Sequence, residues 1–198
     1  QFEISQAELS KSDSQAQKNT STSNLTSLAS SLIAQIQNDS SLTSVQQENQ
    51  VNNVNNTLQT ALSDLNSKDN ACAVSASEKY YTGQLNSQYQ TGIPLTTQQN
   101  NAINNFQSSV SSAIQAIQNS SQLTSAEKQR RLKLINDSFT KLQENVNGAI
   151  NADGINNVVN QTTLPSTIVK ALDFTTFPSL EEQKFSAVSD VETERINA

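Results

Sequence analysis

Apolar residues recur every three or four positions in four stretches of the chain, with polar residues between them. These residues are Leu25, Ala29, Leu32 and Ile36; Val51, Val54, Leu58, Ala61 and Leu65; Ile103, Phe106, Val110, Ala113 and Ile117; and Leu132, Ile135, Phe139, Leu142 and Val146. This spacing places two apolar side chains per two turns on one face of an α-helix, as at heptad positions a and d. The pattern predicts four long amphipathic helices, each of which buries a narrow apolar seam.

The last two stretches repeat the first two at a separation of 81 residues. The segment "SSLIAQIQNDSSLTS" at 30–44 returns as "SSAIQAIQNSSQLTS" at 111–125. Without gaps, residues 30–66 and 111–147 share 12 identities in 37 positions, and their apolar positions stay in phase. Because a biased composition supplies some identities but does not keep apolar positions in phase, we interpret the pattern as an internal duplication.

The boundary between the two stripes of each copy carries the residues of a helix start. Thr43 with Gln46, and Thr124 with Glu127, each fit a capping box, in which a hydroxyl and a reciprocal side chain satisfy free backbone amides. The surrounding segments "NDSSLTS" and "NSSQLTS" therefore predict turns between helices. Each copy is expected to be an antiparallel helical hairpin.

The expected fold class is all-α: a helical bundle of two tandem hairpins at an offset of about 81 residues, with long helices and no sheet. Residues 1–92 would form the first hairpin with an N-terminal segment, and residues 93–165 the second. Residues 166–198 would pack on the bundle through Phe174, Phe177 and Phe185 and end in a frayed tail. Gly and Pro are absent from 1–82 and 95–147, which leaves "YQTGIPLTT" at 89–97 as the linker.

Three finer expectations concern single elements. The return helix of the first hairpin should continue past Leu65 through Cys72 and Val74 to Tyr81, because the next helix breaker is Gly83. Residues 1–20 are the segment most expected to be disordered. A short helix is expected to begin at Ser179, with Glu182 completing its capping box.

The charge of the chain narrows the range of partners. Only 15% of the residues are charged, the net charge is −6 and the isoelectric point is near 4.6. Such a chain gains no overall electrostatic attraction to DNA or to an anionic membrane. Its apolar runs are also far shorter than the roughly 18 residues of a transmembrane helix. We therefore expect no nucleic-acid partner and no membrane-spanning segment.

The composition favours an extracellular protein. The chain begins at Gln1 and contains no methionine, as expected after removal of a secretory signal peptide. Random order of the same residues would give about 6 Asn-x-Ser/Thr sequons, close to the number present. The possible N-glycosylation sites are Asn19, Asn24, Asn38, Asn55, Asn119, Asn136 and Asn160. We expect secretion, and leave open whether these sequons are occupied.

The absence of histidine excludes most chemistry that helical bundles perform. It removes His-dependent triads, His-liganded zinc and the Glu-x-x-His pairs of di-iron bundles. The four glycines are too scattered to form a phosphate loop. We therefore expect no enzyme activity, no cofactor and no metal site.

Cys72 is the only cysteine, so an internal disulfide is excluded. Counting in heptads from Val51, Leu58 and Leu65 places it on the inner seam, where a thiol behaves as a small apolar side chain. The alternative is an intermolecular disulfide, which an odd cysteine in a secreted protein often forms. We expect the buried thiol and keep the intermolecular bridge as the alternative.

Three further groups are interpreted as structural. The basic run "EKQRRLKL" at 127–134 is expected to point Lys128, Arg130 and Arg131 outward as a solvated helix face. Glu181 and Glu182 are expected to be helix-start charges. The tyrosines Tyr80, Tyr81 and Tyr89 are expected to pack the end of a helix.

The helix exteriors carry Asn, Gln, Ser and Thr where soluble bundles usually carry Glu and Lys. Such neutral surfaces suit hydrogen bonding to partners or self-assembly. The favoured function is therefore that of a secreted, non-enzymatic helical-bundle protein acting by protein interaction or assembly. One alternative is a carrier that holds a small apolar ligand or lipid between its helices, although narrow seams close tightly. Another is a bacterial secreted filament-type subunit.

Overall fold

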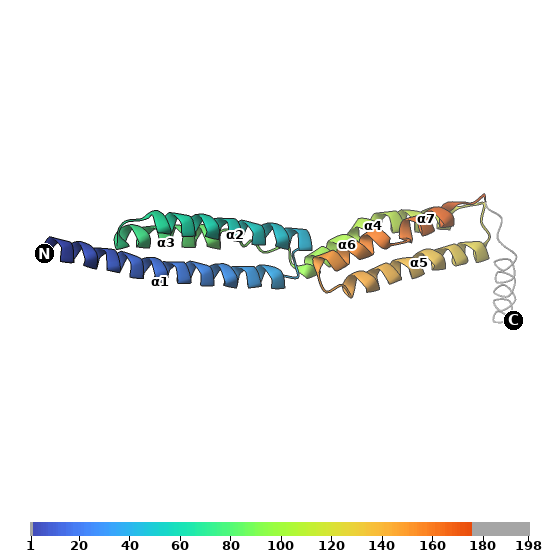
Figure 1. Ribbon diagram of the computed structural model, residues 1–198. Helices are drawn as coiled ribbons and strands as arrows, with labels where there is room; N and C mark the ends of the chain where they lie inside the picture. The colour runs from blue at the N-terminus through green and yellow to red at the C-terminus, as the bar shows by residue number, and fades with distance from the viewer. Residues whose placement is uncertain (1, 176–198) are drawn as a thin grey trace. The chain divides into compact units, whose positions relative to one another are not determined.

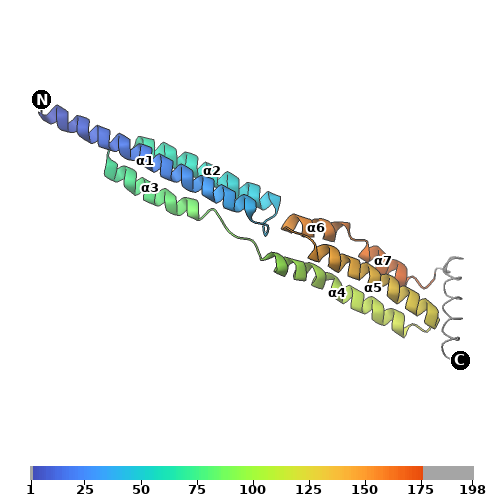
Figure 2. The ribbon, with the colours of Figure 1, turned by 90° about the horizontal axis from the view of Figure 1, so that it is seen from below.

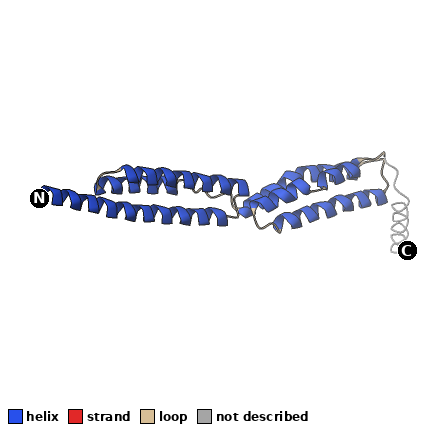
Figure 3. Ribbon diagram, in the orientation of Figure 1, coloured by secondary structure: helices blue, strands red, loops and turns tan. Residues whose placement is uncertain are grey.

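The computed structural model describes residues 2–175, with side-chain detail from Lys11 onward except at Ser12. All the regular structure in this range is helical, in seven helices, and none of it is strand (Figure 3). The expected all-α fold class is thus confirmed. The chain divides into two compact units, unit 1 at residues 1–94 and unit 2 at residues 95–198, and each is described by itself.

Unit 1 is a bundle of three helices. α1 (Phe2–Asn38), α2 (Ser44–Ser67) and α3 (Ala71–Asn86) each contact the other two. Figures 1 and 2 show α1 lying along both of its shorter partners. The core consists of Leu25, Ala29, Leu32, Ile36, Leu42, Val54, Ala61, Leu65, Val74 and Leu85.

The prediction that the return helix continues without a break through Tyr81 is wrong. α2 ends at Ser67, where the N–H of Lys68 donates to the carbonyl oxygen of Leu65. The side chain of Asn70 then accepts from the N–H of Ala73 and starts α3. Polar "SKDN" at 67–70 thus supplies a turn and a cap without any Gly or Pro, because Asn and Asp side chains can bond to the backbone themselves. Gly83, the expected end of the helix, lies inside α3.

Unit 2 contains two long helices and two short ones. α4 (Leu95–Asn119) and α5 (Ser125–Asn147) contact each other, and both contact α6 (Ala152–Gln161) and α7 (Leu164–Leu172). The break between the short helices follows from Pro165, whose ring would clash with the carbonyl group of Gln161 in a continuous helix. The core consists of Ala102, Val110, Ala113, Ile117, Ile135, Phe139, Leu142, Val146, Ile155, Leu164 and Ala171.

The buried residues follow the seams expected from the sequence. All four seam residues of α1 are buried, and on α2, α4 and α5 the seam residues are buried or packed against the core. Both capping boxes are present, at Thr43 with Gln46 and at Thr124 with Glu127. Narrow seams suffice because several helices enclose each core, α1 to α3 in unit 1 and α4 to α7 in unit 2.

The described residues near the two ends of the chain test two of the expectations. For residues 2–20 the expected disorder is wrong, because these residues belong to α1. Phe174 packs against the core of unit 2 as expected. Phe177, Phe185 and the helix start expected at Ser179 lie outside the described residues, as do Glu181 and Glu182.

Candidate functional site

A polar network holds the turn between α1 and α2 against the segment that follows α3. Asp39 accepts hydrogen bonds from the backbone N–H and the hydroxyl of Ser41 through one oxygen, and from the Tyr89 hydroxyl, at 3.1 Å, through the other. Gln50 forms a reciprocal pair with the backbone of Gln90, at 2.9 and 3.0 Å. The segment after α3 is therefore fixed to the rest of unit 1 by side chains of the α1–α2 turn and of α2.

This network changes the acidity of its two ionisable members. Burial alone would raise the pKa of Asp39, but hydrogen bonds from Ser41, Tyr89 and Gly92 together hold that pKa below its usual value. Burial and the neighbouring Asp39 carboxylate raise the pKa of Tyr89. Asp39 is thus held in its charged form as an acceptor, and its oxygens are occupied by structural partners.

A second set of polar residues joins the helices of unit 1 near the α2–α3 turn. Asp64 bonds Lys68 at 2.8 Å and accepts from the buried hydroxyl of Ser77 at 2.6 Å. The hydrogen bond from Lys68 is the largest cause of the lowered pKa of Asp64. Glu78 accepts from the side chains of Ser21 and Asn24 on α1. These carboxylates link helices, and each is occupied by neutral or cationic donors.

Arg131 contradicts the expectation that the basic run lies in solvent. Its side chain is 4% exposed and donates to the carbonyl oxygens of Lys170, Ala171 and Asp173, the second at 2.7 Å. The guanidinium also lies 5.5 Å from the ring centre of Phe174. A cation placed at free carbonyl groups stabilises the C-terminal end of a helix. Arg131 therefore fastens α7 to α5.

The sequence contains no signal that would have distinguished Arg131 from its neighbours. The residue 81 positions earlier is Gln50 of α2, which is half-buried. The carbonyl groups that Arg131 reaches belong to the end of α7, a helix that the sequence pattern did not predict. The ammonium of Lys128 donates to the carbonyl oxygen of Gln118 at 2.9 Å, and this contact lies at the surface. Of the basic run, Arg131 is thus the residue that serves as internal fastening of unit 2.

A groove of about 220 Å³ lies between α5 and the break that separates α6 from α7. Its lining combines apolar residues with hydroxyl, amide and ammonium groups: Ser138, Lys141, Leu142, Asn145, Val158, Gln161, Thr162 and Thr163. Lys141 is the only ionisable residue in this lining. Sequence reasoning missed the groove because it depends on the break before Pro165, which ends α6 at Gln161.

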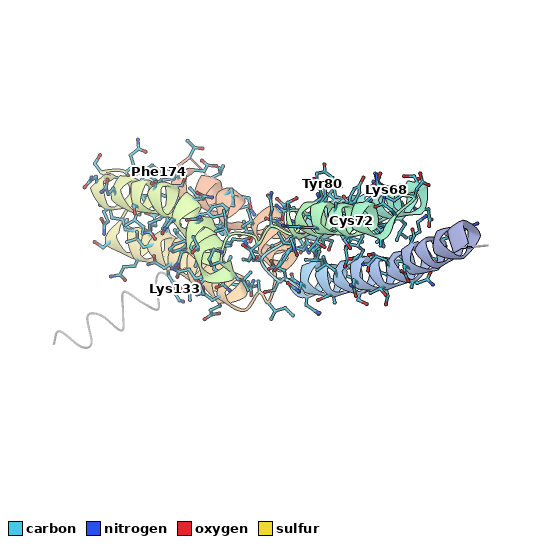
Figure 4. All side chains as sticks on the ribbon, turned by 90° about the vertical axis from the view of Figure 1, so that its left-hand side faces the viewer. Lys68, Cys72, Tyr80, Lys133 and Phe174 are labelled. Carbon is cyan, nitrogen blue, oxygen red and sulfur yellow. The ribbon has the colours of Figure 1, made fainter. Side chains whose placement is uncertain are left out.

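The expectation that Cys72 is buried on the seam is wrong: the thiol is exposed (Figure 4). The heptad count from Val51 does not extend to it, because α2 ends before it and α3 begins a new register. α3 instead buries Val74, Ser77 and Leu85. Cys72 lies in the first turn of α3, directly after the α2–α3 turn.

The three tyrosines separate into two groups. Tyr81 and Tyr89 pack against the core of unit 1, as expected. Tyr80, labelled in Figure 4, does not, since it is 60% exposed. Its ring meets that of Tyr81 edge to face, with 5.0 Å between the centroids. Tyr80 is therefore one of the few large side chains of unit 1 available at the surface.

The asparagines of all seven sequons lie exposed on helices, namely Asn19, Asn24, Asn38, Asn55, Asn119, Asn136 and Asn160. Three of their side-chain amides are engaged: Asn24 donates to Glu78 and Asn38 to the carbonyl oxygen of Ala34, both at 2.8 Å, and Asn19 accepts from Gln15 at 3.0 Å. Glycans at the other four would displace no side-chain partner that the structure shows.

Residues 2–175 hold no cluster of three or more Cys, Asp or Glu side chains suited to a metal ion. In the same range, no helix combines the length and the apolar character needed to cross a bilayer. Comparison of the chain with protein-family models, curated proteins and solved structures finds no match.

Proposed function

We propose that this is a secreted, non-enzymatic helical-bundle protein that acts by protein interaction and assembly. The observation that carries the proposal is the end of unit 1 formed by the α2–α3 turn. There α1 continues past its partner helices, as both ribbon views show (Figures 1 and 2), and there Cys72 is exposed. A projecting end of a helix and an exposed thiol at the same end of a bundle suit contact with a second chain.

The length of the projection follows from the contacts of α1. Lys18 donates to the carbonyl oxygen of Asn66, one residue before α2 ends, and Ser14 is the first buried residue among the described side chains. Residues 2–13 thus form a projecting segment of about 18 Å at 1.5 Å per residue. A helix of this length is only marginally stable without tertiary packing, so a partner that covered one face of it would stabilise it.

We further infer that units 1 and 2 are copies of one three-helix repeat. Three pairs of contacts support this, each separated by 81 residues. Gln47 and Lys128 donate to the carbonyl oxygens of Gln37 and Gln118. Asn70 and Asn151 cap α3 and α6, and Gln50 and Arg131 bond to the carbonyl oxygens of Gln90 and Ala171. On this interpretation the repeat extends beyond the hairpin, and the projecting segment has no counterpart in unit 2, since α4 begins at Leu95.

Electrophoresis of the untreated protein, without and with reductant, tests the assembly proposal. We expect a band of twice the 21.5 kDa chain mass that reductant removes and that Cys72→Ser abolishes. Tyr80→Ser, a control at another exposed residue of α3, should leave the band unchanged. A dimer band that survives Cys72→Ser under non-reducing conditions would contradict the role given to this thiol.

Secretion is supported by the composition and by the exposure of all seven sequon asparagines. An oxidising compartment would also permit an intermolecular disulfide to persist. Mass spectrometry of the native protein before and after glycosidase treatment tests this part of the proposal. A native mass equal to that of the bare chain would show that the sequons are unoccupied.

A further inference from the structure

The groove of unit 2 occupies a place that is filled differently in unit 1. At positions 81 residues earlier, Tyr80 and Tyr81 stand where Gln161 and Thr162 line the groove. Likewise Asp64 and Ser77, bonded at 2.6 Å, correspond to Asn145 and Val158. Tyr81 packs against the core of unit 1, whereas the smaller Thr162 lines an open volume. At two of the positions that line the groove in unit 2, unit 1 thus carries a side chain that packs against its core and a hydrogen-bonded carboxylate.

The lining has the chemistry of a small binding site. Leu142 and Val158 supply apolar surface, and the hydroxyls of Ser138 and Thr163 supply donors and acceptors. The volume of about 220 Å³ is below the roughly 300–1,000 Å³ typical of drug-sized ligands, so it suits a molecule of a few carbon atoms. The lining thus offers a ligand apolar contact at two residues and hydrogen-bonding groups at the others.

The charge of the groove selects the class of ligand. Lys141 brings the only formal charge to the lining, and within residues 2–175 no carboxylate pairs with its ammonium. In contrast, Lys133 on the same helix forms an ion pair with Asp137 at 2.7 Å and lies outside the groove. An unpaired cation beside an apolar floor favours an anion that carries a short hydrocarbon chain.

We propose that the groove between α5 and the α6–α7 break binds a small organic monocarboxylate. The carboxylate lies on Lys141 with the hydroxyls of Ser138 and Thr163, and the hydrocarbon chain lies on Leu142 and Val158. The site is independent of the assembly proposed for unit 1. Because one exposed ammonium contributes little in water, we expect a dissociation constant of the order of 1 mM.

Titration of the full chain with sodium butyrate, followed by amide chemical shifts at constant ionic strength, tests the proposal. We expect saturable shifts in residues 138–145 and 158–163, and none with the neutral analogue butyramide. Lys141→Gln should weaken binding at least about fivefold, whereas Lys133→Gln, the matched control on the same helix, should leave it unchanged.

A second variant tests the groove itself while the charge of Lys141 is kept. Thr162→Tyr places in unit 2 the residue that unit 1 carries at Tyr81, and we expect it to fill the groove and abolish the butyrate shifts while the remaining spectrum stays folded. Shifts that persist in Thr162→Tyr would overturn the assignment to the groove. Equal binding of butyramide, or binding unaffected by Lys141→Gln, would overturn the carboxylate, and absence of saturable shifts to about 50 mM would overturn the proposal as a whole.

Discussion

Arg131 connects the chemistry of a single residue to the stability of unit 2. Its guanidinium satisfies three carbonyl oxygens at the end of α7 and faces the ring of Phe174. We expect Arg131→Ala to lower the free energy of unfolding by about 2 to 4 kcal/mol, because it leaves buried carbonyl groups without donors. Urea unfolding followed by circular dichroism measures the loss.

The controls for this prediction differ in charge and position. Arg131→Lys keeps the charge but offers one compact ammonium, so an intermediate loss is expected. Lys133→Ala removes an exposed ion pair and should cost less than about 1 kcal/mol. Unfolding curves of Arg131→Ala and Lys133→Ala that coincide would show that the fastening of α7 is unimportant for stability.

The lowered pKa of Asp39 predicts that the protein loses stability in acid. Its pKa is lower in the folded chain than in the unfolded chain, so its contribution is present above the unfolded pKa and is lost as the pH falls through the folded pKa. We expect the fall in melting temperature between pH 6 and pH 2 to be largest in the wild type, smaller in Tyr89→Phe and smallest in Asp39→Asn. The same fall in all three proteins would contradict the account.

Gly83 and Gly92 give opposite predictions for the same substitution. A methyl group at Gly92 would overlap the carbonyl group of Ser41. Gly92→Ala should therefore destabilise unit 1, because it separates the segment after α3 from the α1–α2 turn. At Gly83, inside α3, nothing lies within 4 Å of an added Cβ, and Gly83→Ala should stabilise by about 0.5 to 1 kcal/mol. Differential scanning calorimetry should show shifts of opposite sign.

At the scale of elements, the two capping boxes differ in their response to pH. The hydrogen bond from the backbone N–H of Thr124 is the main cause of the lowered pKa of Glu127, whereas Gln46 does not titrate. Thr43→Ala and Thr124→Ala should each cost about 1 kcal/mol at pH 7. As the pH falls through the folded pKa of Glu127, the contribution of this carboxylate is lost, so the cost of Thr124→Ala should shrink while that of Thr43→Ala persists.

Thr43→Ser and Thr124→Ser keep the capping hydroxyl and serve as controls that should remain close to wild type. The measurement is the free energy of unfolding of all four variants at pH 7 and pH 3. An equal response of the two alanine variants to acid would contradict the role assigned to Glu127.

Helices with a clear local sequence pattern could be predicted. Helices whose positions are determined by tertiary packing could not. The seams of α1, α2, α4 and α5 follow a period that composition alone does not produce, and Thr43 and Thr124 mark two helix starts. α3, α6 and α7 are 16, 10 and 9 residues long and bury only two or three residues each, which gives too short a stripe to recognise. Their positions depend on caps such as Asn70 and Asn151 and on the break before Pro165.

At the scale of the whole molecule, the candidate sites were the least predictable feature. The exposure of Cys72 required knowing that α2 ends at Ser67, and the groove required knowing that α6 ends at Gln161. Both features depend on where a helix ends. Heptad counting along the sequence does not detect a helix end, because the count simply continues past it. The sequence could therefore name Cys72 as a candidate but assigned it to the wrong environment.

The central claim, assembly through the α2–α3 end of unit 1, is tested most directly by sedimentation velocity of Cys72→Ser over a range of about 5 to 500 μM. This variant removes the disulfide and isolates the contribution of the projecting segment. We predict a weight-average mass that rises with concentration toward twice the chain mass of 21.5 kDa, and a monomer at every concentration when residues 2–13 are also deleted. A mass of 21.5 kDa throughout for Cys72→Ser, or association undiminished by the deletion, would contradict the account.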